Sequence, residues 1–252
     1  MNWRKILDER KKIKIAAVVG PTASGKTKLA VDICRALNGE AVSCDSMQIY
    51  KYMDIATAKP TVQEMCGIPH HMLDFLEPGE KYSVAAYFTE AGKCIDDISG
   101  RGKLPVLVGG TGLYYSSLVD NISFADEDDD ASIRSELERR AESEGIETLH
   151  RELAAIDPET AAQLHLNNRG RIIRALEVYY KTGVTMSEQQ RRSRLVEPKY
   201  DCTAICLDVR DRQFLYDRID RRVDIMIENG LIEEARRFLS GELGKTSGQA
   251  IG

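Results

Sequence analysis

Several features are missing from this sequence of 252 residues, and each absence excludes a class of protein. No apolar run approaches the roughly 20 residues of a membrane-spanning helix, and the longest clear candidate is Ile15–Val19. That run is also too short for a secretory signal, so we expect a cytoplasmic protein with no membrane contact. The six cysteines lack the paired C-x-x-C spacing of zinc sites. We therefore expect free thiols, buried in the case of Cys202 and Cys206.

The composition is that of an ordinary globular chain, but its charge is unevenly placed. Hydrophobic residues make up 42% and charged residues 30%, which excludes a disordered or collagen-like chain. A net charge of −5 does not by itself suggest a nucleic-acid partner. However, residues 126–159 hold thirteen acids against four arginines, and residues 169–199 hold eight bases against three acids. We interpret the acidic run as a solvated face or linker and the basic stretch as a candidate binding surface.

Strand and helix patterns alternate through most of the chain. Apolar runs ended by turn residues predict strands at 13–19, 40–44, 104–108 and 202–209. Helical patterns are predicted at 25–37, 83–98, from 113 and at 211–228, with Ser83 as an N-cap and Asn229-Gly230 as a stop. Such alternation predicts an α/β fold with a parallel sheet. Residues 131–190 show only helical patterns, so we predict a core at 1–120 and 201–252 and an inserted all-helical domain at 121–200.

One complete phosphate-binding motif follows the first predicted strand and opens the first predicted helix. It matches G-x-x-x-x-G-K-[ST] and consists of Gly20, Pro21, Thr22, Ala23, Ser24, Gly25, Lys26 and Thr27. Its glycines let backbone N–H groups and the helix N-terminus face a phosphate. Lys26 adds a positive charge, and the Thr27 hydroxyl is placed to ligate Mg²⁺. The core is therefore predicted to be P-loop NTPase-like.

The rest of the expected site departs from a motor-type NTPase. Such an enzyme would supply an apolar strand ending in Asp, whereas strand 104–108 ends in Gly109-Gly110-Thr111. Because the carboxyl ends of parallel strands share one edge, Asp45, Ser46, Gln48 and Thr111 are expected near the phosphate loop. Capping of a turn is the alternative role for Asp45.

Two arginines on the predicted helix 211–228 are candidates for the same site. Arg218 and Arg222 are four residues apart, beside the apolar stripe of this helix. That spacing suits a clamp on phosphate oxygens, opposite Lys26. The alternative is surface ion pairing with the neighbouring carboxylates of Asp217, Asp220 and Asp224.

Six segments together resemble the signatures of the tRNA dimethylallyltransferase family. They are Gly20–Thr27, Asp45-Ser46-Met47-Gln48-Ile49-Tyr50, Thr57-Ala58-Lys59-Pro60, Pro69-His70-His71, Gly109-Gly110-Thr111-Gly112-Leu113-Tyr114 and Arg171-Ile172-Ile173-Arg174-Ala175-Leu176-Glu177. Their order and spacing match across essentially the whole chain. The resemblance implies transfer of a dimethylallyl group from its diphosphate to the exocyclic amine of the adenine beside the tRNA anticodon, at position 37. It also implies that the loop holds this diphosphate rather than ATP.

The resemblance implies a role for each matching residue. Catalytic roles are expected for Asp45 and Thr111 and, from the spacing on helix 211–228, for Arg222, while Arg218 on the same helix is expected to join the loop in binding the donor. The implied tRNA contacts are Asp45, Ser46, Met47, Gln48, Thr111, Arg134, Gly170, Arg171, Ile172, Ile173 and Arg174. The insertion would be the arm that grips the anticodon stem-loop. The expected partners are this stem-loop, dimethylallyl diphosphate and Mg²⁺ on Thr27, with the protein a monomer.

The chemistry of the reaction suggests why a carboxylate is needed. The adenine amine is a weak nucleophile, so a base that accepts its proton helps the reaction, and Asp45 is the best-placed candidate. Three alternatives stay open: an adenylate isopentenyltransferase acting on free nucleotides, a P-loop nucleoside or nucleotide kinase, and an RNA-binding protein with a nucleotide switch. Residues 249–252 resemble the start of a family motif, so we expect that a further C-terminal region of the family is missing here.

Overall fold

The computed structural model describes residues 12–122 and 132–239. The acidic run at 126–130 and the segment at 249–252 lie outside these ranges. The chain divides into two compact units, one formed by Met1–Val119 with Pro198–Gly252 and the other by Asp120–Glu197. None of the described helices combines the length and apolarity that a membrane span requires.

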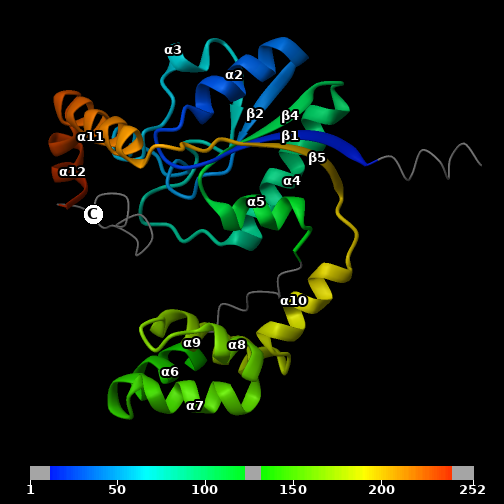
Figure 1. The fold of residues 1–252 in the computed structure, drawn as a ribbon, viewed down its shortest axis with the longest axis vertical. Helices are drawn as coiled ribbons and strands as arrows, with labels where there is room; N and C mark the ends of the chain where they lie inside the picture. Colours follow the sequence, from blue (N-terminus) through cyan, green and yellow to red (C-terminus); the bar gives the residue numbers. More distant parts are fainter. Residues whose placement is uncertain (1–11, 123–131, 240–252) are drawn as a thin grey trace, which may run out of the picture. The chain divides into compact units, whose positions relative to one another are not determined.

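The first unit is built on a five-stranded sheet, in which every neighbouring pair of strands is parallel. The strand order is β3-β2-β4-β1-β5 (Figure 1). The strands are β1 (Ile13–Val19), β2 (Gly39–Ser43), β3 (His70–His71), β4 (Leu104–Gly109) and β5 (Tyr200–Cys206). Strands β2 and β4 are almost wholly buried, as expected for a parallel sheet covered on both faces.

Helices cover the two faces of the sheet (Figure 1). On one face, α2 (Lys26–Leu37) packs Ala30 and Cys34 against Val18 and Val106. On the other, α4 (Val84–Gly100) and α5 (Gly112–Val119) cover a larger apolar cluster. The remaining helices of this unit are α3 (Val62–Met65), α11 (Arg212–Glu228) and α12 (Leu231–Leu239). The α/β fold with a parallel sheet is therefore confirmed.

Local chemistry explains where several helices begin and end. The Ser83 hydroxyl accepts a hydrogen bond from Ala86 N at 3.1 Å, so the predicted N-cap of α4 is confirmed. Asp211 caps α11 by accepting from Gln213 N. Helix α11 ends at the predicted stop, and Gly230 takes a positive φ of 98° before α12 begins.

Strand β5 differs from its predicted bounds. The prediction was 202–209, but β5 starts at Tyr200, opposite Ile13, and ends at Cys206, opposite Val19. The reason is that β5 is an edge strand whose length is set by its single partner, β1. One consequence is that Cys206 is exposed, so its predicted burial was wrong. The short elements α3 and β3 were not predicted.

A buried carboxylate ties three strands together at the amino end of the sheet. Glu40 on β2 is only 2% exposed and accepts from the two terminal guanidinium nitrogens of Arg101, Nη1 and Nη2, at 2.6 and 2.8 Å. Lys103 and His71 each lie 2.7 Å from the same carboxylate. The hydrogen bond from Arg101, helped by those from Lys103 and His71, holds the pKa of Glu40 far below its usual value despite burial. The carboxylate thus stays ionised and joins β2, β3 and the start of β4.

The second unit is all-helical over its described residues. It comprises α6 (Ser132–Ser143), α7 (Ile146–Ile156), α8 (Pro158–Gln163), α9 (Arg169–Thr182) and α10 (Met186–Leu195). Its own core includes Leu149, Leu153, Ile172 and Leu176. The buried Asp157 carboxylate caps α8 through Thr160 and also accepts from Ser187 N at 3.0 Å, which fixes the start of α10. The fold thus contains an all-helical unit within the chain of the α/β core.

Candidate active site

The phosphate-binding motif forms the loop between β1 and α2. Gly20 and Gly25 have φ angles of 147° and 96°, and Ala23 has a φ of 60°. A side chain at Gly20 would meet the Leu207 carbonyl oxygen at 2.5 Å, so only glycine fits there. Helix α2 begins at Lys26, directly after Gly25, so its free N–H groups border the loop. The geometry is that of an anion-binding helix N-terminus.

The Lys26 ammonium lies against its own loop. Its Nζ donates to Gly20 O at 3.0 Å and to Pro21 O at 2.7 Å. Burial lowers the pKa of Lys26, the Asp45 carboxylate opposes this, and the positive charge of Arg222 lowers it further. Asp45 at the end of β2 and Arg222 on α11 therefore both contribute to the electrostatic environment of this ammonium.

Helix α11 brings the two candidate arginines to the phosphate loop. Arg218 Nε donates to Ala23 O at 2.8 Å, across 195 residues of sequence. The Arg218 guanidinium also lies 5.7 Å from the centre of the Phe214 ring. Arg222, one turn further along, is half-buried and acts on Lys26. Arg218 of the predicted clamp therefore contacts the loop, and Arg222 lies one turn further along the same helix.

Hydrogen bonds beyond the ends of β2 and β4 bring Thr111 to the Asp45-Ser46 turn. Cys44 N donates to Val108 O at 2.8 Å, and Thr111 N donates to Cys44 O at 3.0 Å. The Thr111 hydroxyl then accepts from Ser46 N at 2.9 Å and lies 3.2 Å from Ser46 Oγ. The structure therefore places Thr111 and Ser46 together at this edge of the sheet, as the sequence predicted.

The Asp45 carboxylate divides its two oxygens between two environments. Oδ1 accepts from Met47 N at 2.9 Å and from Gln48 N at 3.4 Å, which is the turn capping considered as an alternative role. Within the described residues, Oδ2 makes no hydrogen bond. The side chain is half-buried. One oxygen thus orients the carboxylate while the other is available to a ligand.

The Gln48 side chain has a supporting contact that the sequence did not reveal. Its Nε2 donates to Thr57 O at 3.3 Å and to Ala58 O at 3.2 Å. Its Oε1 accepts from Ser43 Oγ at 3.4 Å. The amide therefore holds the loop at 57–58 against the end of β2. The Thr57-Ala58-Lys59-Pro60 segment was recognised as a motif, but its spacing gave no indication of this partner.

Buried aromatic side chains support the turn from beneath. The Tyr87 hydroxyl donates to Ser43 O at 2.9 Å and contacts Cys44 Sγ, and its ring stacks on Tyr114 with centroids 3.8 Å apart. Burial raises the pKa of Cys44 to about 12, so this thiol stays protonated at neutral pH and is no nucleophile. Sequence reasoning missed Tyr87 because a tyrosine on the apolar face of a helix usually signals core packing alone.

The donor atoms around the loop suit Mg²⁺ bound together with phosphate. Thr27 and Asp45 offer hydroxyl and carboxylate oxygens, which are the hard ligands that Mg²⁺ prefers. Ser24 Oγ is buried and, in the described structure, has no hydrogen-bond partner. The described residues contain no group of three or more His, Cys, Asp or Glu side chains that could cage a metal alone. A bound diphosphate and water would have to complete the coordination.

In the second unit, a buried carboxylate holds several of the predicted RNA-binding cations. Glu177 is 4% exposed and lies 3.2 Å from Arg134, 3.1 Å from Arg174 and 3.2 Å from Lys181. Burial alone would raise the pKa of Glu177, but the hydrogen bonds from Arg174 and Lys181 lower it. Arg134 and Arg174 therefore stabilise this unit internally.

The remaining predicted residues of α9 fall on two different faces. Arg171 is exposed, as is Gly170 near the start of the helix. Ile172 and Ile173 are 0% and 2% exposed and lie in the helical core. The structure assigns these two isoleucine side chains to packing, and RNA contact at the two positions stays a prediction. Their packing instead fixes which face of α9 presents Arg171.

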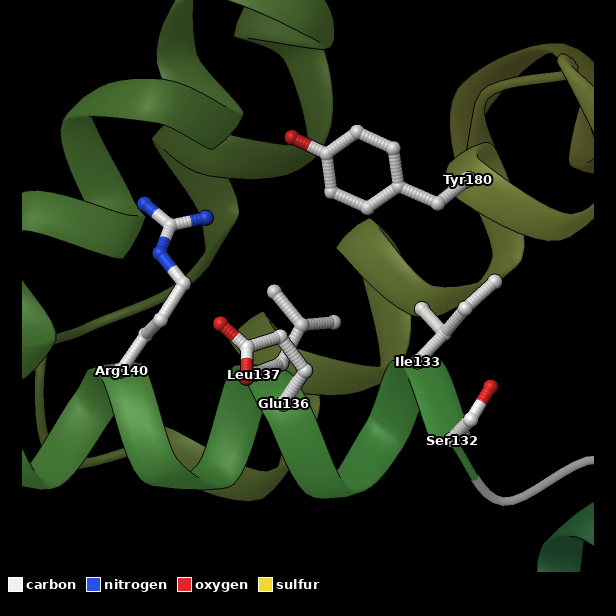
Figure 2. A pocket seen from close by; sticks show the side chains of 6 residues that line it. All are labelled: Ser132, Ile133, Glu136, Leu137, Arg140 and Tyr180. Atoms are coloured by element: carbon white, nitrogen blue, oxygen red, sulfur yellow. The ribbon is translucent and has the colours of Figure 1, made fainter.

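A shallow cavity of about 480 Å³ in the second unit is lined by Ser132, Ile133, Glu136, Leu137, Arg140 and Tyr180 (Figure 2). Figure 2 shows Arg140 and the Tyr180 ring beside it, with Ile133 and Leu137 below. Arg140 pairs with Glu144 and Glu152, and the Tyr180 hydroxyl donates to Glu152. The charged groups at this cavity are therefore satisfied within the protein.

Comparison with known proteins defines the family. The family described as IPP transferase matches residues 48–252, and the family described as isopentenyl transferase matches residues 13–75. A tRNA dimethylallyltransferase of Caldanaerobacter subterraneus is 50% identical over 243 residues, covering 95% of this chain and 77% of the relative. One of Oceanobacillus iheyensis is 50% identical over 225 residues, covering 89% and 71%.

Solved structures agree with these relatives. The tRNA isopentenylpyrophosphate transferase of Bacillus halodurans is 44% identical, with a TM-score of 0.64, covering 96% of this chain and 75% of that one. A eukaryotic dimethylallyltransferase acting on tRNA is 33% identical, with a TM-score of 0.78, covering 90% and 56%. The relatives and the solved structures together place the chain in a class of prenyl-transferring enzymes. The chain belongs to the IPP transferase family.

The close approach of two strand ends predicts a strict requirement for glycine at position 109. A Cβ atom there would lie 2.2 Å from the Cys44 carbonyl oxygen. Because this oxygen belongs to the backbone, it cannot move away without distorting the strand pairing. We expect Gly109→Ala to destabilise the protein by about 1–3 kcal/mol, as overpacking does. Thermal unfolding measures this. The control is Gly110→Ala, where the added carbon meets nothing within 4 Å. Equal melting temperatures for the two variants would contradict the prediction.

Proposed function

We propose that the protein transfers a dimethylallyl group from dimethylallyl diphosphate to tRNA and releases diphosphate. The acceptor is the exocyclic amine of the adenine beside the anticodon, at position 37. Membership of the family and the relatives named tRNA dimethylallyltransferase support the reaction. The single observation that carries it is the Asp45 carboxylate, whose second oxygen is free at the edge of the sheet where the phosphate loop opens, so that a diphosphate bound by the loop would lie near it.

The donor side of the reaction is electrostatic. When the bond between the allylic carbon and the diphosphate oxygen breaks, both electrons leave with the diphosphate. The loop N–H groups and Lys26 face the growing negative charge from one side, and Arg218 and Arg222 border it from α11. Preorganised donors of this kind stabilise a transition state strongly because they need no reorganisation. Thr27, with Asp45 nearby, would hold Mg²⁺, which supplies further neutralisation of the leaving diphosphate.

The acceptor side needs a base. As the amine nitrogen of adenine forms its bond to the allylic carbon, it must lose a proton. Asp45 Oδ2 accepts this proton, while Oδ1 keeps the carboxylate oriented through Met47 N and Gln48 N. Thr111 and Ser46 line the same edge of the sheet and suit contacts to the adenine ring. The adenine reaches this edge only after leaving the stack of the anticodon loop.

The helical unit contributes to RNA binding by charge. The stretch at 169–199 carries eight bases against three acids, and Arg171 stands exposed on α9. Contacts between such side chains and phosphates give affinity without reading sequence. We therefore assign this unit to the anticodon stem-loop.

The experiment that tests the proposed function supplies the purified protein with labelled dimethylallyl diphosphate and Mg²⁺. One sample contains an unmodified tRNA with adenine at position 37, a second AMP, and a third the same tRNA with guanine at that position. We expect label in the first sample only. Label in AMP would instead indicate the free-nucleotide enzyme. Transfer of phosphate from ATP to a nucleoside, with no prenyl transfer, would indicate a kinase.

The Asp45→Asn variant distinguishes the role of Asp45 as a proton acceptor from its role as a turn cap. Asparagine caps a turn about as well as aspartate but cannot accept the proton. We expect the single-turnover rate with saturating tRNA to fall by about 10²–10⁴ fold, with less than a tenfold change in tRNA affinity. Rapid quench with labelled donor measures the rate.

Two controls complete the Asp45 experiment. Asp201→Asn changes an exposed aspartate on β5 and should leave the rate unaltered. A series of Mg²⁺ concentrations tests whether Asp45 acts only by ordering the metal, in which case excess Mg²⁺ restores the rate. A rate of Asp45→Asn within threefold of the unaltered protein would remove Asp45 from the catalytic residues.

Arg171→Glu tests the RNA-binding role of the helical unit. Arg171 is the cleaner target because changing Arg174 would leave Glu177 with fewer partners and disturb folding. We expect weaker tRNA binding and a salt dependence whose log–log slope falls by about 0.7–0.9 for each phosphate that the variant no longer neutralises. Filter binding at several salt concentrations measures both. Arg151→Glu, an exposed change on α7, is the control. Unchanged affinity of Arg171→Glu at fixed salt would refute the assignment.

A further inference from the structure

A buried carboxylate on α12 has an unusual set of partners. Glu234 is 4% exposed, and its two oxygens accept from three successive backbone N–H groups of the loop after β2. Oε2 accepts from Asp54 N at 2.9 Å and from Ile55 N at 3.0 Å. Oε1 accepts from Ile55 N at 3.1 Å and from Ala56 N at 2.8 Å. The loop thus forms an anion-binding nest around a side chain some 180 residues away in sequence.

This contact is strong and specific. A carboxylate is costly to bury unless hydrogen bonds replace its water, and hydrogen bonds to a charged acceptor are about twice as strong as neutral ones. Phe238, one turn beyond Glu234 on α12, packs with Ile49, Tyr50 and Met53 of the same loop. One polar and one apolar contact therefore fix α12 on the loop.

The loop held by Glu234 leads directly to the acceptor edge of the site. Immediately after the nest come the carbonyls of Thr57 and Ala58, which accept from Gln48 Nε2. The Gln48 backbone N–H in turn donates to Asp45 Oδ1, at 3.4 Å. A chain of hydrogen bonds thus runs from the nest to the oriented carboxylate.

The other end of the same helical pair reaches the donor edge. Helix α12 follows α11 after the turn at Gly230, where φ is 98°. Helix α11 carries Arg218, bonded to the phosphate loop at Ala23 O, and Arg222, which acts on Lys26. Glu234 therefore connects the helical pair that carries Arg218 and Arg222 to the loop at 54–58, which supports the turn of Asp45 through Gln48.

We propose that Glu234 is a positioning residue for prenyl transfer: its carboxylate, seated in the Asp54–Ala56 nest, sets the distance between the arginines of α11 and the Asp45–Gln48 turn. Glu234 itself touches neither substrate. The inference rests on the proposed function, because it assigns to Glu234 the alignment of that reaction's donor and base. Misplacement of reacting groups by 1 Å can reduce a rate by about 100-fold.

The test compares three variants in single-turnover prenyl transfer with saturating donor and tRNA. Glu234→Gln keeps the shape but replaces one acceptor oxygen by an NH₂ group that faces backbone donors. Glu234→Asp keeps the charge but shortens the reach. Glu233→Gln, at the exposed neighbouring position, is the matched control. We expect the rate constant to fall 10–100-fold for the two Glu234 variants and to stay within twofold for the control.

Two readouts distinguish positioning from a structural role. A single-turnover rate constant does not depend on the active fraction, so a residue needed only for folding would lower the amplitude and the melting temperature but leave the rate constant unaltered. In addition, tRNA affinity should change less than threefold. In the Asp45→Asn background, Glu234→Gln should lower the rate constant by less than threefold, because the carboxylate that Glu234 positions has already been removed.

Each outcome decides between the alternatives. Rate constants within twofold of the unaltered protein, or an undiminished penalty in the Asp45→Asn background, would overturn the proposal. Failure of both Glu234 variants to fold would make Glu234 a folding residue and would overturn it as well. An unaltered protein that prenylates no tRNA would refute the proposed function, whereas active Glu234 variants of an active enzyme would refute only the positioning role.

Discussion

The backbone hydrogen bonds that continue the β2–β4 pairing beyond the strands are the constraint on which the acceptor edge depends. They bring Cys44 so close to Gly109 that no side chain fits at 109. In return they place the Thr111 hydroxyl on Ser46 and aim the Asp45 carboxylate at the edge of the sheet. Because β1 is the other neighbour of β4, the phosphate loop opens at that same edge. The site is thus a consequence of strand order and strand length, with backbone rather than side chains setting its dimensions.

The opposite wall of the site comes from a distant part of the sequence. Helices α11 and α12 contact the core through Arg218 to Ala23 O, through Glu234 to the Asp54–Ala56 nest and through the packing of Phe238. No residue of α11 is fully buried, so its placement depends on such directional contacts more than on apolar packing. The hydrogen bond to Ala23 O fixes the direction of the Arg218 side chain, which the proposed electrostatic stabilisation of a leaving diphosphate requires.

Local signals in the sequence predicted most of the fold and the donor half of the site. The phosphate motif, the Ser83 cap and the Asn229-Gly230 stop each depend on neighbours within a few residues. The rule for parallel strands then sufficed to bring Asp45 and Thr111 to one edge. The contacts of Gln48 and Glu234 were not predictable, since their partners are backbone groups of a loop whose course only the tertiary structure defines. The length of β5 was missed for a related reason, because it depends on pairing with β1.

The cations of the helical unit show why charge counts overstate an RNA-binding surface. Arg134 and Arg174 share the buried Glu177, and removing them from it would leave the buried charge with Lys181 alone of these three cations. Arg191 and Arg192 instead pair with Glu188 at the surface. Exposed pairs contribute only about 0–1 kcal/mol, so a phosphate oxygen can replace the carboxylate at little cost. The two kinds of arginine look alike in sequence, but burial of the partner separates them. In the proposed RNA contact, the available charge therefore comes from exposed arginines such as Arg171 and from those whose present partners are exposed.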